Sequence, residues 1–433
     1  MSNNHHKGKH REIVLLFSLS LITGVLTGLT ASFYRWGLQT INHMRIRVFS
    51  GLSLGNPLKL LGIWLFFLAV GLLLGKIGSF FPQISGSGIP QVKGVLFRKI
   101  SYLHWKAELF FKFLTGLLGI GCGLSLGREG PSVQLGSYVG YGVAEICGVS
   151  EVEERHLVTA GAGAGLAGAF GAPLAGVMFS LEELHRVITS KLLIATFVAA
   201  VAADFVGRRM FGMNPAFNMS VRYPAEMNPY LHFGLMILFG IGVAFVGKLF
   251  TRSLTLFQDL FHLARFSRRI KICFVMTTAF ILCFLLPEAT GGGHELAESL
   301  IVSKETLIFL IFIFVVKFLF TVLSYSTGFA GGIFLPMLVL GAILGKIYAI
   351  CLMGILGLGP EQIPHYMILG MTAFFVAVVR APLTGTVLIL EMTGTFEHLL
   401  ALTLISAIAF LVTDLLNLAP VYEILYDRMD KGK

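Results

Sequence analysis

Three short segments combine glycines with a proline that stands at the start of an apolar run. They are Ser85-Gly86-Ser87-Gly88-Ile89-Pro90, Gly127-Arg128-Glu129-Gly130-Pro131 and Gly332-Ile333-Phe334-Leu335-Pro336. Proline is tolerated in the first turn of a helix, where its missing N–H would have no partner, and glycine lets the backbone approach a ligand closely. Helix N-termini bind anions through free N–H groups and a partial positive charge. The pattern therefore predicts three helix starts that bind an anion weakly enough to release it. The alternative is that the glycines serve only helix–helix packing.

One of these segments also contains an acid, Glu129. An ionised carboxylate is itself an anion, so at a helix N-terminus it can occupy the place of the bound ion. Protonation removes that charge and releases the side chain. Glu129 is thus expected to link anion binding to proton binding.

The composition indicates that these segments lie in a membrane. Only 13% of the 433 residues are charged and 55% are hydrophobic, with a mean hydropathy of +0.82, whereas a soluble domain has about 25% charged residues. This composition excludes a soluble domain and a disordered chain. Long unalternated apolar runs of near-spanning length favour helices over a β-barrel; examples are residues 13–31, 58–74, 231–250 and 307–323. We expect an all-α, polytopic membrane protein.

The net charge of +10 comes from short basic clusters between the apolar runs and at both ends. Such clusters favour cytoplasmic flanks over nucleic-acid binding, and we expect both termini in the cytoplasm. The expected organisation is a tail over residues 1–12, a membrane domain over 13–426 and a tail over 427–433. The five cysteines include no CxxC pair and the histidines no HExxH motif, so neither a metal nor another cofactor is expected.

The chain contains an internal repeat. At an offset of 205, ten of the 29 positions from 112 to 140 are identical, and at an offset of 209 Ala172-Pro173-Leu174 falls on Ala381-Pro382-Leu383. The halves cover approximately residues 13–215 and 230–426. Two related halves with glycine- and proline-interrupted segments at corresponding positions are typical of transporters and channels.

Acidic residues differ between the halves. Glu182 aligns with Glu391, which suggests a shared structural task such as capping, whereas Glu183 aligns with Met392. An ionisable group in a membrane segment is a functional candidate, although Glu183 also fits a solvated helix end. Glu129 aligns with Phe334 and is likewise unexplained by a shared role.

A pair of lysines is shared instead. Lys112 aligns with Lys317. We expect Lys317 to be structural, and Lys112 either structural or a local bias toward anions.

The three segments, together with Tyr422, resemble the four signature regions of the CLC chloride channel and transporter family, in the family's order and along nearly the whole chain. The resemblance implies about eighteen tilted, partial helices in two inverted-topology repeats. It also implies a homodimer in which each subunit has its own pore. The chain ends soon after Tyr426, so we expect a bacterial-type member without CBS domains, in the bacterial inner (plasma) membrane.

The resemblance also assigns roles to residues. Ser87 and Tyr422 would supply hydroxyls to a central chloride, and a serine at position 87 resembles that of chloride-selective members. Glu129 would be the external gate and Glu183 the internal proton-transfer residue. Backbone N–H groups would complete the pathway, at Gly88, Ile89, Arg128, Gly130, Ile333 and Phe334.

These roles predict exchange of chloride for protons by a secondary transporter. The alternative is a passive voltage- or pH-gated chloride channel. An intramembrane protease or lipid hydrolase is disfavoured, because no histidine lies in an apolar run near a serine-centred glycine motif. A dinucleotide-like pattern, Gly163-x-Gly165-x-x-Gly168, is better explained by close helix packing.

Overall fold

The computed structural model describes residues 2–53, 55–217, 219, 221–224, 227–263 and 266–431. These form seventeen α-helices and five short helical segments, with no strand among the described residues. The helices of the first half are α1 (Ser2–Ser50), α2 (Pro57–Phe80), α3 (Ile89–Leu96), α4 (Trp105–Gly121), α5 (Glu129–Cys147), α6 (Glu151–Phe170), α7 (Pro173–Phe179) and α8 (Ser190–Phe211). Those of the second half are α9 (Pro229–Leu263), α10 (Arg268–Leu285), α11 (His294–Val302), α12 (Leu307–Ser326), α13 (Phe334–Leu356), α14 (Ile363–Val379), α15 (Pro382–Thr393), α16 (Leu399–Leu415) and α17 (Val421–Lys431). The short segments are η1 (Pro82–Ile84), η2 (Ser180–His185), η3 (Pro287–Ala289), η4 (Pro360–Gln362) and η5 (Phe396–His398).

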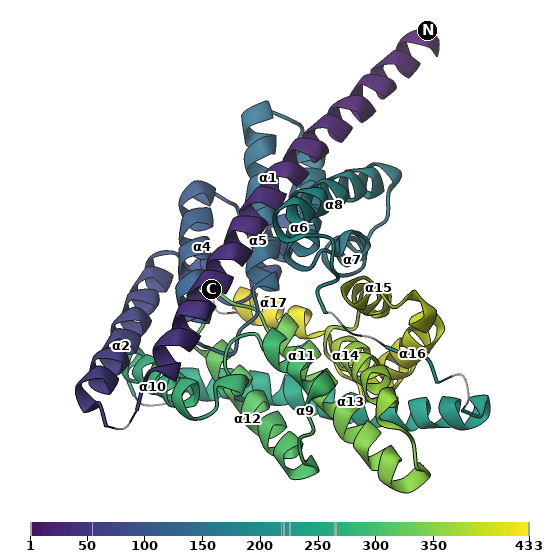
Figure 1. The fold of residues 1–433 in the computed structure, drawn as a ribbon. Helices are drawn as coiled ribbons and strands as arrows, with labels where there is room; N and C mark the ends of the chain where they lie inside the picture. The colour runs from purple at the N-terminus through teal and green to yellow at the C-terminus, as the bar shows by residue number, and fades with distance from the viewer. Residues whose placement is uncertain are drawn as a thin grey trace.

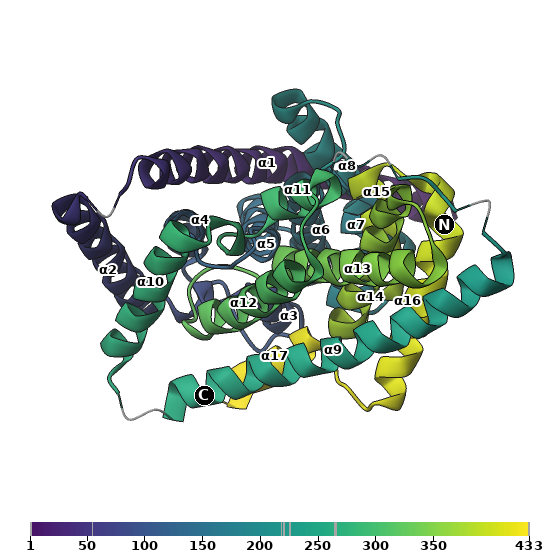
Figure 2. The same ribbon diagram turned by 60° about the horizontal axis from the view of Figure 1, so that its bottom comes forward.

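The prediction of an all-helical membrane protein is confirmed. Within the described residues, eight helical segments are long and apolar enough to cross a membrane, and the four apolar runs named above fall in α1, α2, α9 and α12. The 35-residue α9 is about 52 Å long at the usual helical rise, longer than a hydrocarbon core of about 30 Å. It must therefore tilt or extend beyond the core, and Figure 2 shows it running along one side of the molecule.

Most helices of the two halves lie in different parts of the molecule, although α2 of the first half packs against α10 of the second. In Figure 1 the helices α4 to α8, coloured blue to teal, lie above the helices α9 to α14, coloured teal to yellow-green. The C-terminal helix α17 lies between them and contacts α3 of the first half. The chain end is thereby brought to the helix that begins beside Ser87.

Matched glycines explain how corresponding helices pack. The helix α5 packs along α6 as α13 packs along α14. A Cβ atom on Gly136 would overlap the carbonyl of Gly161, and one on Gly341 would overlap that of Gly370. The repeat therefore preserves glycine where two helix backbones touch.

The dinucleotide-like pattern has the same explanation. Gly163 lies against the backbone of Gly176, and Gly165 lies against the carbonyl of Ser132. The prediction that this pattern serves helix packing is confirmed.

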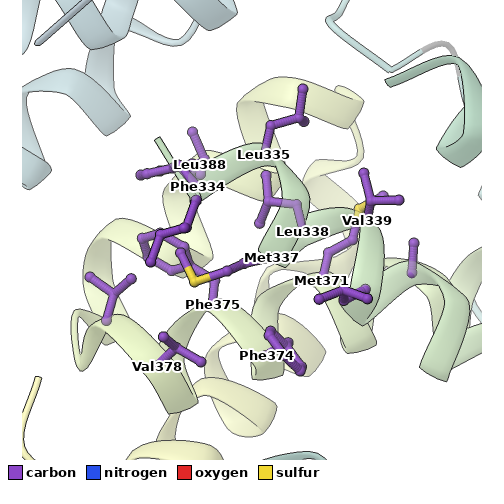
Figure 3. Close-up of a cluster of buried hydrophobic side chains, with 14 of the residues drawn as sticks. Phe334, Leu335, Met337, Leu338, Val339, Met371, Phe374, Phe375, Val378 and Leu388 are labelled. Carbon is purple, nitrogen blue, oxygen red and sulfur yellow. The ribbon is translucent and has the colours of Figure 1, made fainter. Parts of the chain in front are cut away.

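The apolar core continues to the start of α13. The Phe334 ring lies 4.8 Å from that of Phe375 on α14 (Figure 3). It lies 5.4 Å from that of Phe170 on α6. Aromatic contacts from both halves thus hold the first residue of α13 in place.

Candidate functional site

The start of α3 is held by residues of the second half. Gly86 donates its N–H to the carbonyl of Gly328 at 3.1 Å, and Gly331 donates to the carbonyl of Gly86 at 3.0 Å. Gly88, the residue before α3, has φ of +90°, a left-handed conformation that favours glycine. Ser87 is buried, and its hydroxyl accepts a hydrogen bond from the N–H of Ile89 at 3.3 Å. Ser87 is therefore fixed where α3 begins, as predicted from the Gly-Ser-Gly pattern.

The starts of α5 and α13 meet directly. Gly127 N–H donates to the carbonyl of Gly332 at 2.6 Å, and Gly332 N–H donates to the carbonyl of Gly127 at 2.8 Å. This isolated antiparallel bridge joins the same position of the two repeats. Such a reciprocal exchange is what a two-fold relation between the halves produces. It aims the first turns of both helices at one region.

Glu129 lies at this junction. Its side chain is fully buried, and within the described residues neither carboxylate oxygen has a hydrogen-bond partner of good geometry. The nearest cation is Arg128, whose Nε lies 3.8 Å from Oε1. A buried carboxylate normally needs hydrogen bonds or a paired charge, so this one depends on the helix starts and on Arg128.

Tyr422 reaches the same region from α17. Its side chain is fully buried, and its hydroxyl has no hydrogen-bond partner in the described part of the chain. Its phenol lies within electrostatic range of Tyr325, Glu183 and Glu129. An unpaired buried hydroxyl is uncommon, and a polar ligand within reach would satisfy it.

Glu183 lies in η2, directly after α7, and its side chain is buried. Its Oε1 lies 2.5 Å from the Nζ of Lys93 on α3. The alternative of a solvated helix end is therefore wrong for Glu183. Sequence reasoning missed Lys93 as its partner, because the two residues are 90 positions apart and no local pattern joins them.

Glu182 and Glu391 cap each other's half, which confirms the structural role predicted from their alignment. Glu182 accepts hydrogen bonds from the N–H groups of Leu383 and Thr384 at the start of α15, at 3.2 and 2.7 Å. Glu391 accepts from Leu174 and Ala175 at the start of α7, at 3.0 and 2.8 Å. Each acid accepts hydrogen bonds from N–H groups in the first turn of a helix that begins with proline.

The aligned lysines also share one task. Lys112 donates to the carbonyls of Ile84 and Gly86, both at 2.8 Å. Lys317 donates to the carbonyl of Gly291 at 2.7 Å and to that of Ala289 at 3.1 Å. For Lys112, which sequence reasoning left undecided, these contacts favour the structural role of fixing the loop before Ser87.

A cavity of about 770 Å³ lies beside Arg128. Arg35 and Arg45 of α1 contribute cationic side chains to its wall, and Glu288, Glu295 and Glu298 contribute acids. Leu126 and Leu335 also line it, next to the starts of α5 and α13. Sequence reasoning missed this vestibule, because its walls come from segments that are far apart in the chain.

The fold and the site define a class of protein. Several helices begin at a buried point between two related halves, a discontinuous arrangement typical of membrane transporters and channels. Among the described residues, no group of three or more His, Cys, Asp or Glu side chains is arranged to hold a metal ion.

Comparison with known proteins identifies the family. Residues 66–414 match the family model described as voltage gated chloride channel. The chain is 34% identical to the H(+)/Cl(-) exchange transporter ClcA of Vibrio cholerae serotype O1, an alignment that covers 99% of this chain and 93% of that protein. It is 33% identical to the transporter of the same name from Salmonella schwarzengrund, over 96% of this chain and 89% of that one. The chain therefore belongs to the voltage-gated chloride channel (CLC) family, as the signature segments predicted.

Solved structures give the same result. A slow cyanobacterial Cl-/H+ antiporter has a TM-score of 0.88 at 30% identity, and the match covers 96% of this chain and 97% of that one. A eukaryotic CLC transporter has a TM-score of 0.79 at 22% identity, over 96% of this chain and 74% of that chain, and shows the shared fold. The predicted CLC-type fold is confirmed.

Proposed function

We propose that this protein exchanges chloride for protons across a membrane, with Glu129 as the gate that couples the two ions. The observation that carries the proposal is the fully buried Glu129 carboxylate, which lacks a well-formed hydrogen bond within the described residues and lies where α5 and α13 begin. Two similar proteins are exchange transporters by name, and a solved neighbour is an antiporter. These relatives favour exchange over the alternative, a passive chloride channel.

Chloride binding would use neutral groups. The hydroxyls of Ser87 and Tyr422, both buried, would donate to the ion. The N–H groups of Ile333 and Phe334 would contribute from the start of α13, and those of Gly88, Ile89, Arg128 and Gly130 would line the rest of the pathway. Dipoles of this kind stabilise an anion but permit release, whereas a lysine contact would retain it.

Proton coupling would follow from competition at Glu129. When ionised, its carboxylate takes the place of an anion between the helix starts. A proton that reaches it from Glu183 neutralises the side chain, which leaves the path and admits chloride. Loss of the proton toward the vestibule beside Arg128 returns the carboxylate to the path. Each passage of a proton thereby requires displacement of the anion.

The test is a coupled flux assay in reconstituted vesicles. A chloride gradient should drive protons uphill. Glu129→Gln and Glu129→Ala should each abolish proton pumping and leave chloride flux, because neither side chain carries a releasable proton. Glu183→Gln should stop proton flux and retain chloride flux. Chloride movement without proton pumping in the unmodified protein would instead establish the channel alternative.

We also propose a homodimer with one pore per subunit, multi-pass in a bacterial inner (plasma) membrane with both termini cytoplasmic, as the family resemblance implies. The basic C-terminal cluster supports the orientation, because cytoplasmic flanks carry excess Lys and Arg. Chemical cross-linking in membranes at low protein density should trap dimers and no larger species. A cysteine placed near residue 428 should react with a membrane-impermeant reagent only in inside-out vesicles.

A further inference from the structure

The ion pair between Lys93 and Glu183 connects the helix proposed to bind chloride with the residue proposed to carry the proton. The Lys93 Nζ lies 2.5 Å from Glu183 Oε1, and each side chain is only 3% exposed. Lys93 is four residues beyond Ile89 on α3, so it lies about one turn from the end that is proposed to bind chloride. The helix that begins beside Ser87 therefore also carries the counter-ion of the proposed proton acceptor.

Three further groups face this pair. Arg186 follows η2, and its guanidinium pairs with Glu423 of α17 at 3.0 Å. Both of these side chains are about 40% exposed, so they form the water-accessible edge of the cluster. Tyr422, next to Glu423 on α17, lies within electrostatic range of Glu183. Lys93, Glu183, Arg186 and Glu423 thus form a cluster of alternating charge between α3, η2 and α17.

Protonation of Glu183 breaks the pair. A neutral carboxyl leaves the Lys93 ammonium buried without its nearest counter-charge, which is costly where water is excluded. An opposite charge at this distance therefore opposes proton uptake by the carboxylate. The Arg186 charge acts in the same direction, whereas the charge of Glu423, which is paired with Arg186, acts against it.

We propose that Lys93 is a positioning residue for proton transport, whose charge favours the ionised form of Glu183 and thereby sets the pH at which protons enter the cycle. The inference rests on the proposed function, in which Glu183 carries the proton. It adds a residue on the anion-binding helix whose charge determines when Glu183 accepts that proton.

The test compares proton flux as a function of pH on the Glu183 side in vesicles containing wild type, Lys93→Met or Lys93→Arg. Removing the positive charge should move the midpoint of proton transport to higher pH by about 1–3 units, because protonation of Glu183 no longer leaves a buried ammonium without its counter-charge. Lys93→Arg should keep the midpoint near that of wild type. Chloride flux in Lys93→Met reports that the protein is folded.

Lys346→Met is the matched control. Lys346 is also a buried lysine paired with a glutamate, with its Nζ 2.6 Å from Glu305, but it lies on α13 away from η2. The Lys346→Met variant should lose stability without a change in the pH midpoint of proton transport. An equal shift in this control would show a general effect of losing a buried pair and would overturn the inference.

A second measurement covers the case in which Lys93→Met does not fold. Infrared titration of Lys93→Gln in detergent should show a carboxylic-acid band, absent in Lys93→Gln/Glu183→Gln, that persists to higher pH than in wild type. An unchanged titration, with Glu183→Gln still blocking proton flux, overturns the role of Lys93 alone. Normal proton flux in Glu183→Gln overturns instead the proposed proton carrier on which the inference rests.

Discussion

The reciprocal caps predict that two adjacent glutamates differ completely in their roles. Glu182 accepts two backbone N–H bonds and one hydroxyl bond, the last from Thr384 at 2.7 Å. Hydrogen bonds to a charged group contribute roughly 1.5–3 kcal/mol each, and loss of a helix cap typically costs about 1 kcal/mol. Water can partly replace these bonds at the exposed start of α15. We therefore expect Glu182→Ala to lower the stability of the folded state by about 2–4 kcal/mol.

The assay is the fraction of protein that stays monodisperse in detergent after heating, because unfolding of such a protein is operationally irreversible. Glu182→Ala should shift the apparent midpoint down by several degrees, and Glu182→Gln by less, since the amide keeps one acceptor. Glu391→Ala should destabilise similarly, because it removes two bonds from the start of α7. The proton-to-chloride ratio should stay unchanged in all three variants. A Glu182→Ala protein that melts like wild type, or that loses coupling as Glu183→Gln should, would refute this assignment.

Three further predictions concern the anion site and its surroundings. Lys112→Met should weaken chloride binding, measured by calorimetry, because two carbonyls before α3 lose their donor. Unchanged affinity would argue against the role of Lys112 in fixing the loop. Tyr422→Phe removes a hydroxyl that has no hydrogen-bond partner among the described residues. Chloride affinity should therefore fall, and the melting midpoint should remain unchanged. The hydrogen bond from Arg186 lowers the pKa of Glu423 below its ordinary 4.5. This exposed pair stabilises the folded state by less than about 1 kcal/mol. That stabilisation is present above pH 4.5 and is lost as the pH falls through the lowered pKa. Arg186→Gln should remove that pH dependence of the melting midpoint, and retention of it would assign the effect to other groups.

Most of the fold was accessible from the sequence because membrane helices leave long apolar runs and helix contacts leave glycines. Gly136 and Gly341 occur at matched positions, and both turned out to lie at close backbone approaches. The alignment of Glu182 with Glu391 likewise predicted a shared structural task. Such features are local or repeated, so one chain displays them twice.

The remaining features depend on contacts between distant segments. The Lys93–Glu183 pair joins α3 to η2. The arginine-lined vestibule lies between α1 and the start of α11. Neither has a spacing rule, since a salt bridge fixes a distance in space and not an interval in sequence. The carbonyl groups that accept hydrogen bonds from Lys112 could not be predicted either, because a lone lysine in an apolar run is compatible with several partners.

The differences between the halves indicate why the proposed gate exists only once. The helix starts of α5 and α13 are joined directly through Gly127 and Gly332. A second acid at Phe334 would place two carboxylates beside one junction, where they would repel each other and one would remain protonated. Phe334 instead packs among aromatic rings of both halves. The repeat thus supplies two converging helix starts, and the departure from symmetry at Glu129 leaves one carboxylate that can compete for the proposed anion site.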